Sequence, residues 1–412
     1  MILKQLIIYR LSELTKNKTP EGYKRVNNSI IPVDWCVETL GDIVEYKKGF
    51  AFKSTDYCDK GVRIIRISDT TYNSIKDDSP VYIDRDCKDN NSEYELVQGD
   101  LIVSSVGSRP PLYDSMVGKV IRVPSTIQGA LLNQNAIRLR AKVGYYQDYI
   151  YNNLKTKKYL THIETSVRGN ANQVSITLED LFRFEIKIPS IAEQKVISEI
   201  LLTWDQAIEL KENLIEEKQR QKSGLMQKLL TGKVRLPGFD GELNYTSIDS
   251  HIKEIKLKNK SNKETRVLSV TNKLGFILQE EQFDRVVASK DLSNYKVVKN
   301  GQFAYNPSRV NVGSIDQLKN FDSGLLSPMY VVFECTEGLV SSYLYHFIKS
   351  DMFLNVIPNM LQGSVRDSLS FDSLKLIKLF VPSVCEQEAI AEILNKADIE
   401  IKLHEKELEA LK

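Results

Sequence analysis

Hydrophobic residues recur along the chain either at every second position or three to four positions apart. The change from one spacing to the other indicates where strands and helices are expected. Alternating runs predict strands, among them VRIIRIS, DLIVSSV and KVIRV before residue 124 and RVLSV, QFAYN and YVVFE after residue 265. Helical spacing follows each group, from Tyr145 to Leu160 and from Leu339 to Asp351. Each half of the chain is therefore expected to fold as an α+β domain.

Two longer helical stripes have apolar residues three or four positions apart. The first predicts a helix of roughly 60 Å that ends at Thr231–Gly232, because glycine suits a left-handed helix cap. Narrow stripes on long helices favour a partner helix, so we expect the two to pair as an antiparallel coiled coil, although each could also be the edge of an ordinary core. The stripe residues expected to pair or to dock a partner are Ile197, Leu201, Trp204, Ile208, Ile215, Ile390, Leu394, Ile401 and Leu408.

An internal repeat begins both stripes. Residues 189–201 read PSIAEQKVISEIL and residues 382–394 read PSVCEQEAIAEIL, an offset of 193 that also aligns ITLE (176–179) with LSFD (369–372). A short strand ending at proline precedes each copy, FEIKIP and KLFVP. The repeat predicts a pseudo-twofold layout with a first globular domain at 1–188, a central long helix at 189–235, a second globular domain at 236–381 and a C-terminal helix at 382–412.

Charge is distributed unevenly over the 412 residues, although the net charge is only +2. A net charge this small excludes a surface that is positively charged throughout, so any nucleic-acid binding must come from local patches. Residues 211–235 hold seven Lys/Arg against three Glu, and residues 386–412 hold eight Asp/Glu against four Lys, which is compatible with pairing of the two helices, although surface ion pairs contribute little each. The basic run at 251–266 is either a solvated face or a phosphate contact.

The cysteines and the lack of an apolar stretch long enough to span a membrane indicate the cellular compartment. Five separated cysteines without a C-x-x-C pattern favour a reducing cytosol and a cytoplasmic location. The N-terminal MILKQLIIYRLSEL carries three charges and is expected to be a helix that packs inward, with no membrane span.

Catalytic motifs are not convincing anywhere in the chain. The nearest match to the N/D-P-P-aromatic loop of adenine methyltransferases is Asn306-Pro307-Ser308-Arg309, which lacks the second proline and the aromatic residue. No phosphate-binding G-x-x-x-x-G-K-[ST] occurs, and the four histidines are scattered without metal-ligand spacing. We therefore expect no catalytic residue, no metal and no cofactor in this chain.

Polar loops with Arg, Asn, Gln and Ser occur at matching places in the two domains. Such side chains suit base edges and phosphates, since Arg pairs with guanine and Asn or Gln with adenine, but ordinary polar turns have the same composition. The candidate DNA-binding residues are Ser104, Ser105, Arg109, Arg168, Asn170, Asn172, Gln173, Asn306, Arg309, Asn311, Gln362, Ser364 and Arg366.

The doubled P-S-[IV]-x-E-Q-x-x-I-x-E-I-L pattern, followed in its first copy by KSGLMQKLLTGKVRLPGFDGE at 222–242, resembles the specificity (S) subunits of Type I restriction-modification systems. The resemblance implies a non-catalytic subunit in which each target-recognition domain reads half of an interrupted double-stranded DNA site. It also implies that the helices space the domains and dock two methylation (M) subunits, with restriction (R) subunits joining the complex. S-adenosylmethionine would then bind the methylation subunit, and ATP and magnesium the restriction subunit.

Other interpretations stay open at this point. One is an enzyme, a cryptic DNA methyltransferase or nuclease, and another is a cytosolic coiled-coil scaffold without a DNA role. Lys412 aligns with Gln219 at the 193 offset, so the second helix has no counterpart of residues 220–232 and docking of the second methylation subunit stays in doubt. Self-association of the free chain through its helices also stays open.

Overall fold

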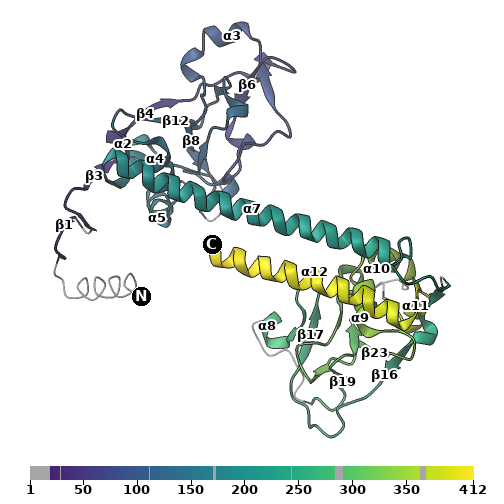
Figure 1. Ribbon diagram of the computed structural model, residues 1–412. Helices are drawn as coiled ribbons and strands as arrows, with labels where there is room; N and C mark the ends of the chain where they lie inside the picture. Colours follow the sequence, from purple (N-terminus) through teal and green to yellow (C-terminus); the bar gives the residue numbers. More distant parts are fainter. Residues whose placement is uncertain are drawn as a thin grey trace. The chain divides into compact units, whose positions relative to one another are not determined.

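The computed structural model of the chain describes residues 19–412 except Asn28, Pro111, residues 170–172, Leu243, residues 284–290 and residues 362–367. The N-terminal segment expected to form a helix therefore lies outside the described residues. The chain divides into two compact units, Met1–Gln206 and Ala207–Lys412, and the dividing point falls inside the long helix α7 (Ile191–Leu229) (Figure 1).

Unit 1 is built around a four-stranded antiparallel sheet in the order β10-β8-β12-β4. A second four-stranded sheet, β11-β6-β7-β5, packs beside it. The strands are β1 (Tyr23–Val26), β2 (Ser29–Pro32), β3 (Cys36–Thr39), β4 (Val44–Lys48), β5 (Tyr57–Cys58), β6 (Val62–Ile65), β7 (Val81–Ile83), β8 (Leu101–Ser104), β9 (Val106–Gly107), β10 (Val120–Arg122), β11 (Leu131–Leu132), β12 (Ala136–Ala141), β13 (Val174–Ser175) and β14 (Glu185–Ile188). The helices are α2 (Leu40–Ile43), α3 (Asp86–Asp89), α4 (Gln147–Asn153), α5 (Lys157–Ser166), α6 (Leu178–Phe182) and the start of α7.

Unit 2 repeats the main sheet of unit 1. Its order β16-β23-β20-β21 corresponds strand for strand to β4-β12-β8-β10, and all neighbours are again antiparallel. The strands are β15 (Tyr245–Ser247), β16 (Ile252–Ile255), β17 (Leu268–Thr271), β18 (Gly275–Leu278), β19 (Lys296–Lys299), β20 (Phe303–Tyr305), β21 (Ile315–Gln317), β22 (Ser323–Leu326), β23 (Val331–Cys335) and β24 (Lys378–Phe380). The helices are α8 (Gln279–Phe283), α9 (Ser341–Ile348), α10 (Asp351–Met360), α11 (Phe371–Lys375) and α12 (Val384–Leu411). The expected α+β fold with an internal repeat is confirmed.

Each globular part begins and ends at the same two-stranded ribbon. In unit 1, β3 pairs antiparallel with β14, and in unit 2, β15 pairs antiparallel with β24 in the equivalent register. An equivalent backbone hydrogen bond follows the first strand of each ribbon. The Leu40 N–H donates to the Phe184 carbonyl, and the Ile248 N–H donates to the Ile377 carbonyl. Both strands expected before the repeated prolines are therefore present.

Local sequence signals place the helices around these ribbons. The hydroxyl of Thr177 accepts from the Asp180 N–H at the start of α6, and Ser370 caps α11 in the same way through Ser373. The long helix α7 stops two residues short of Thr231, and Gly232 then takes a left-handed conformation (φ 69°). The predicted helix start and stop signals are thus confirmed.

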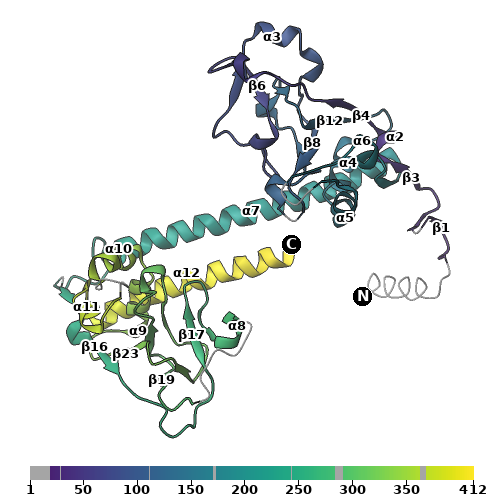
Figure 2. The ribbon, with the colours of Figure 1, turned by 180° about the vertical axis from the view of Figure 1, so that it is seen from behind.

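Antiparallel pairing joins the second half of α7 to α12 within unit 2, as both ribbon views show (Figures 1 and 2). Lysine amines of one helix lie 2.5–2.7 Å from carboxylates of the other. Residues 211 and 212 of α7 pair with residues 407 and 412, whereas residues 218 and 222 pair with residues 400 and 398, so the two helices run in opposite directions. These ion pairs are Glu212–Lys412, Lys211–Glu407, Lys218–Glu400 and Lys222–Asp398. The basic segment of the first helix therefore faces the acidic second helix, as its charge pattern predicts.

Burial of apolar side chains holds each unit together separately. In unit 2, Met226, Leu229 and Leu230 at the end of α7 share a core with Ile390 and Leu394 of α12. In unit 1, the ribbon and main sheet enclose a core that includes Leu40, Leu101 and Ile186. Across the described residues, no helix is both long enough and apolar enough to cross a membrane.

Candidate nucleic-acid interface

Two loops far apart in the sequence meet at one end of the unit 1 sheet. Strand β9 pairs with β13, so the loop after β8 lies against the hairpin that carries Arg168. Gly107 is needed at this contact, because a Cβ there would come within 2.3 Å of the Ser115 carbonyl oxygen. The pairing brings together polar residues that the sequence analysis could associate only by composition.

Four of the predicted unit 1 residues are exposed or half-buried at this place. Arg109 is exposed and donates to the Gly169 carbonyl at 3.4 Å, and Arg168 is exposed with an ion pair of 3.1 Å to Asp180. Ser105 is half-buried and Gln173 is exposed. Asn170 and Asn172 lie outside the described residues, so their predicted role stays a prediction.

Ser104 has a different position from the one expected. Its side chain is fully buried, and the hydroxyl donates to the Met116 carbonyl at 2.8 Å. All four residues of β8 are buried because the strand has core side chains on both of its faces, and Ser104 is its last residue, opposite Ala136 of the neighbouring strand. Ser104 therefore serves inside the sheet, and the residue after it begins the exposed loop.

In unit 2, the equivalent loop follows β20. The Asn306 N–H donates to the Ser314 carbonyl, and Arg309 and Asn311 are exposed on the short turn between them. The Leu369 N–H donates to the Pro307 carbonyl, as the Ile176 N–H donates to the Ser105 carbonyl in unit 1. Gln362, Ser364 and Arg366 lie outside the described residues.

One buried lysine and one half-buried lysine support the unit 1 loops, and neither was predicted from the sequence. Lys119 is 1% exposed, and its amine donates to the carbonyls of Thr70 and Asp114 at 2.7 and 2.5 Å. Burial lowers the pKa of Lys119 to about 8. The signal was present in VGKVI, where one charged residue interrupts an apolar strand.

Lys155 also donates to a backbone carbonyl near the unit 1 loops. Its amine donates to the Tyr72 carbonyl at 2.7 Å and lies 4.0 Å from the centre of the Tyr72 ring. Burial lowers the pKa of Lys155 to about 8 as well. Tyr72 in turn packs against Tyr113, so both lysines fix the segments next to the Arg109 loop.

The repeated E-Q pair fixes each globular part to its helix. The Gln194 side chain accepts from the Tyr146 N–H at 2.9 Å, and the Gln387 side chain accepts from the Val340 N–H at 2.8 Å. The glutamate beside each glutamine has a different partner in each copy. Glu193 accepts from the Trp35 indole at 3.1 Å, whereas Glu386 is fully buried and forms a bidentate pair with Arg235.

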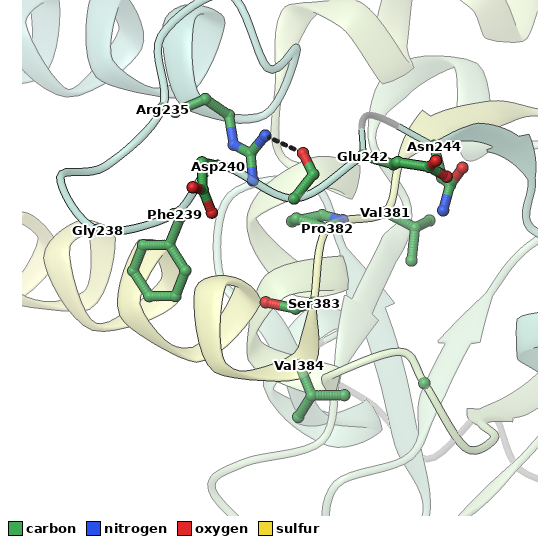
Figure 3. A pocket seen from close by; sticks show the side chains of 12 residues that line it. Arg235, Gly238, Phe239, Asp240, Glu242, Asn244, Val381, Pro382, Ser383 and Val384 are labelled. Atoms are coloured by element: carbon green, nitrogen blue, oxygen red, sulfur yellow. Dashed lines mark hydrogen bonds between the residues drawn. The ribbon is translucent and has the colours of Figure 1, made fainter.

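A pocket of about 560 Å³ lies beside this second anchor. Figure 3 shows Arg235 reaching across it to donate to the Gly241 carbonyl, at 2.8 Å, with Asp240, Glu242 and Ser383 around it. Residues 238–242 therefore lie beside the start of α12. The pocket belongs to this anchor and lies at the N-terminal end of α12.

The predicted helix-pairing residues fall into three groups by burial. Leu201 and Trp204, on the part of α7 in unit 1, are 41% and 51% exposed. Ile197 is half-buried against the unit 1 core, and Ile208 and Leu408 are also half-buried. The remaining members are buried in unit 2, namely Ile215, Ile390, Leu394 and Ile401.

Metal-ligating and disulfide chemistry find no support in the part of the chain that the structure describes. Within those residues no group of three or more His, Cys, Asp and Glu is placed to hold a metal ion. The five cysteines are free thiols. The fold and the site define a protein built from two copies of one α+β unit. Each unit carries a cluster of polar loops, and both units contain the same helical repeat.

This description fits a known family. The Type I restriction modification DNA specificity domain matches residues 32–219 and 325–412, and the chain belongs to that family. The MjaVIII specificity subunit of a Type I restriction enzyme, from Methanocaldococcus jannaschii, is 25% identical over 53% of this chain. The putative MjaX specificity subunit from the same organism is 29% identical over 51%. These matches cover 51% and 49% of the relatives, so the chain spans about half the length of the curated relatives it matches.

Solved structures support the fold. The S subunit of a Type I restriction-modification system from M. genitalium has a TM-score of 0.57 over 94% of both chains, at 16% identity. A second structure, from work on complex assembly and conformational transition of the type I R-M system, has a TM-score of 0.54 at 14% identity and covers 92% of this chain and 95% of that one. At these identities the likeness concerns the fold alone.

Proposed function

We propose that this chain is the DNA specificity subunit of a Type I restriction-modification complex. Each globular part reads one half of an interrupted double-stranded DNA site, and the helices space the two parts and dock methylation subunits. The observation that carries the proposal is the duplicated frame, in which the same sheet order supports loops of different polar sequence. Two matched frames with different loops suit two different half-sites.

The subunit itself is non-catalytic in this proposal. Methyl transfer belongs to two methylation subunits that bind S-adenosylmethionine, and cleavage belongs to restriction subunits that use ATP and magnesium. The family membership and the relatives named as specificity subunits support this division. The complex acts on DNA in the cytoplasm.

The test is methylome sequencing in a host that lacks DNA methylation. The chain is expressed alone, the methylation subunit from the adjacent gene is expressed alone, and then both are expressed together. We expect a bipartite adenine motif only with both proteins. Methylation by the chain alone would make it an enzyme, and absence of any motif would favour a scaffold without a DNA role.

A further inference from the structure

A hollow of about 450 Å³ opens between the loop cluster and the main sheet of unit 1. Four segments line it: the end of β4, the loop after β8, the turn before β12 and the strand β13 with the residues that follow it. The Ser105 N–H donates to the Asn135 carbonyl at 2.8 Å, and the Ile176 N–H donates to the Ser105 carbonyl at 3.0 Å, so three of these segments are joined by backbone bonds. The hollow is thus built by the sheet itself.

Apolar side chains form part of the lining of this hollow, and four polar or cationic side chains beside them are free to take a ligand. Among the described residues, Lys48, Ser105, Asn135 and Ser175 line it with no side-chain hydrogen-bond partner. The described residues of the lining include one lysine and no acidic side chain. Arg109 and Arg168 lie on the two neighbouring loops. An amide and hydroxyls beside cations match the edge of a base next to a phosphate.

Asn135 is held in a conformation that costs energy for most residues. Its φ is 66°, in the left-handed region that asparagine tolerates better than other residues with a Cβ. The backbone bond from Ser105 fixes the position, while the side chain remains exposed. The turn therefore presents an amide, with one acceptor and two donor hydrogens, at the edge of the hollow.

Unit 2 shares the lysine of this pair but not the amide. Lys48 is the last residue of β4, and the matched sheet registers make Lys256, the residue that follows β16, its counterpart in unit 2. By the same register Asn135 corresponds to Met329, an apolar residue that is 61% exposed. The amide of Asn135 is therefore a property of unit 1 and gives it a means of reading DNA that differs from that of unit 2.

We propose that this hollow is a DNA-reading site of unit 1, in which Asn135 bonds an adenine edge and Lys48 the neighbouring phosphate. The inference rests on the proposed function, because it assigns residues to one of the two half-sites. Asparagine pairs with adenine through its N6 and N7 atoms, and lysine neutralises a phosphate without reading sequence. The two residues therefore have separable roles.

The test uses the full complex with its methylation subunits and measures both the methylated motif and DNA affinity at several salt concentrations. For Asn135→Gly and Asn135→Asp, both compatible with the left-handed backbone, we expect one adenine position in one half of the motif to become relaxed, with the other half unchanged. For Lys48→Met we expect weaker binding, an unchanged motif and a salt slope smaller by about one. Asn27→Gly, another asparagine with positive φ, and Lys60→Met are the matched controls.

The outcomes separate this inference from the proposed function. If the unsubstituted complex produces a bipartite motif and the Asn135 and Lys48 variants keep both its sequence and its affinity, the hollow does not read DNA. If the unsubstituted complex produces no bipartite motif, the proposed function itself fails. Circular dichroism of each variant identifies one that does not fold, in which case the second Asn135 variant decides.

Discussion

Gln194 and Gln387 make the same pair of hydrogen bonds in the two units, 193 positions apart. Each side chain accepts from the N–H that precedes a helix, at 2.9 and 2.8 Å, and donates to the carbonyl of the repeated proline, at 3.0 and 2.8 Å. Gln387 also donates to the Gly338 carbonyl at 2.8 Å. Both side chains are buried, so the repeated glutamine connects three segments of each unit at one point.

Replacing this glutamine should destabilise unit 2. In Gln387→Ala, the Val340 N–H and two carbonyls lose their buried partner, and a buried unsatisfied group costs about 1–3 kcal/mol. We expect a loss of that order in chemical denaturation. Gln221→Ala, an exposed glutamine on α7, is the control and should change little. Equal effects of the two substitutions would contradict the role of the buried amide.

Arg235 should matter more than the exposed helix ion pairs. Arg235→Ala leaves the fully buried Glu386 carboxylate without its bidentate partner, and a buried unpaired charge is strongly unfavourable. We expect a marked fall in the unfolding temperature, partly restored by Arg235→Ala combined with Glu386→Gln. Arg220→Ala, which breaks only exposed pairs within α7, is the comparison. Similar melting of both single variants would refute this ranking.

The helix pairing can be tested by exchanging charges. Lys218→Glu alone places two carboxylates together, whereas Lys218→Glu with Glu400→Lys restores an ion pair in the opposite sense. We expect a small loss in thermal stability for each single variant and recovery in the double variant, because both side chains are partly solvated. A double variant no better than the sum of the singles would show that this pair does not couple.

Stability should fall in acid because of His346. Burial, the main cause, lowers the pKa of His346 to about 4, although the hydrogen bond with Asn395 opposes the shift. The unfolded chain binds this proton near pH 6.5 and the folded chain only near pH 4, so stability present above pH 6.5 is lost as the pH falls toward 4. The loss is at most about 3 kcal/mol. In His346→Gln the change in unfolding free energy between pH 7 and pH 5 should shrink, and His162→Gln should retain it.

A domain exchange tests the modular arrangement. Replacing Tyr245–Phe380 with the matching segment of another specificity subunit cuts the chain at both strands of the β15–β24 ribbon. We expect methylome sequencing to show one half of the motif changed and the other preserved, since the two sheets and their loops are separate. Changes in both halves, or in neither, would contradict independent reading.

Much of the fold was predictable because it depends on local rules. The stripe on α7, the caps at Thr177 and Ser370 and the glycine after the helix follow from spacing and residue type. The sheet order was not, because β8, β12 and β4 pair across long stretches of chain. The burial of Ser104 depends on the cores that cover both faces of β8, which the sequence does not reveal. The candidate DNA-binding residues could be grouped only by composition, because the pairing of β9 with β13 joins distant segments.

The two-stranded ribbons at which each globular part begins and ends also affect how the chain folds as it is synthesised. Strand β3 ends at Thr39, but its partner β14 begins only at Glu185. Strands β15 and β24 are likewise far apart in the sequence. Contacts of such large sequence separation form late and slowly, whereas the 39-residue helix between them can form from neighbouring residues alone. On the ribosome, each globular unit is therefore expected to gain its native closure only after its last strand has emerged, so the first unit folds fully before the second.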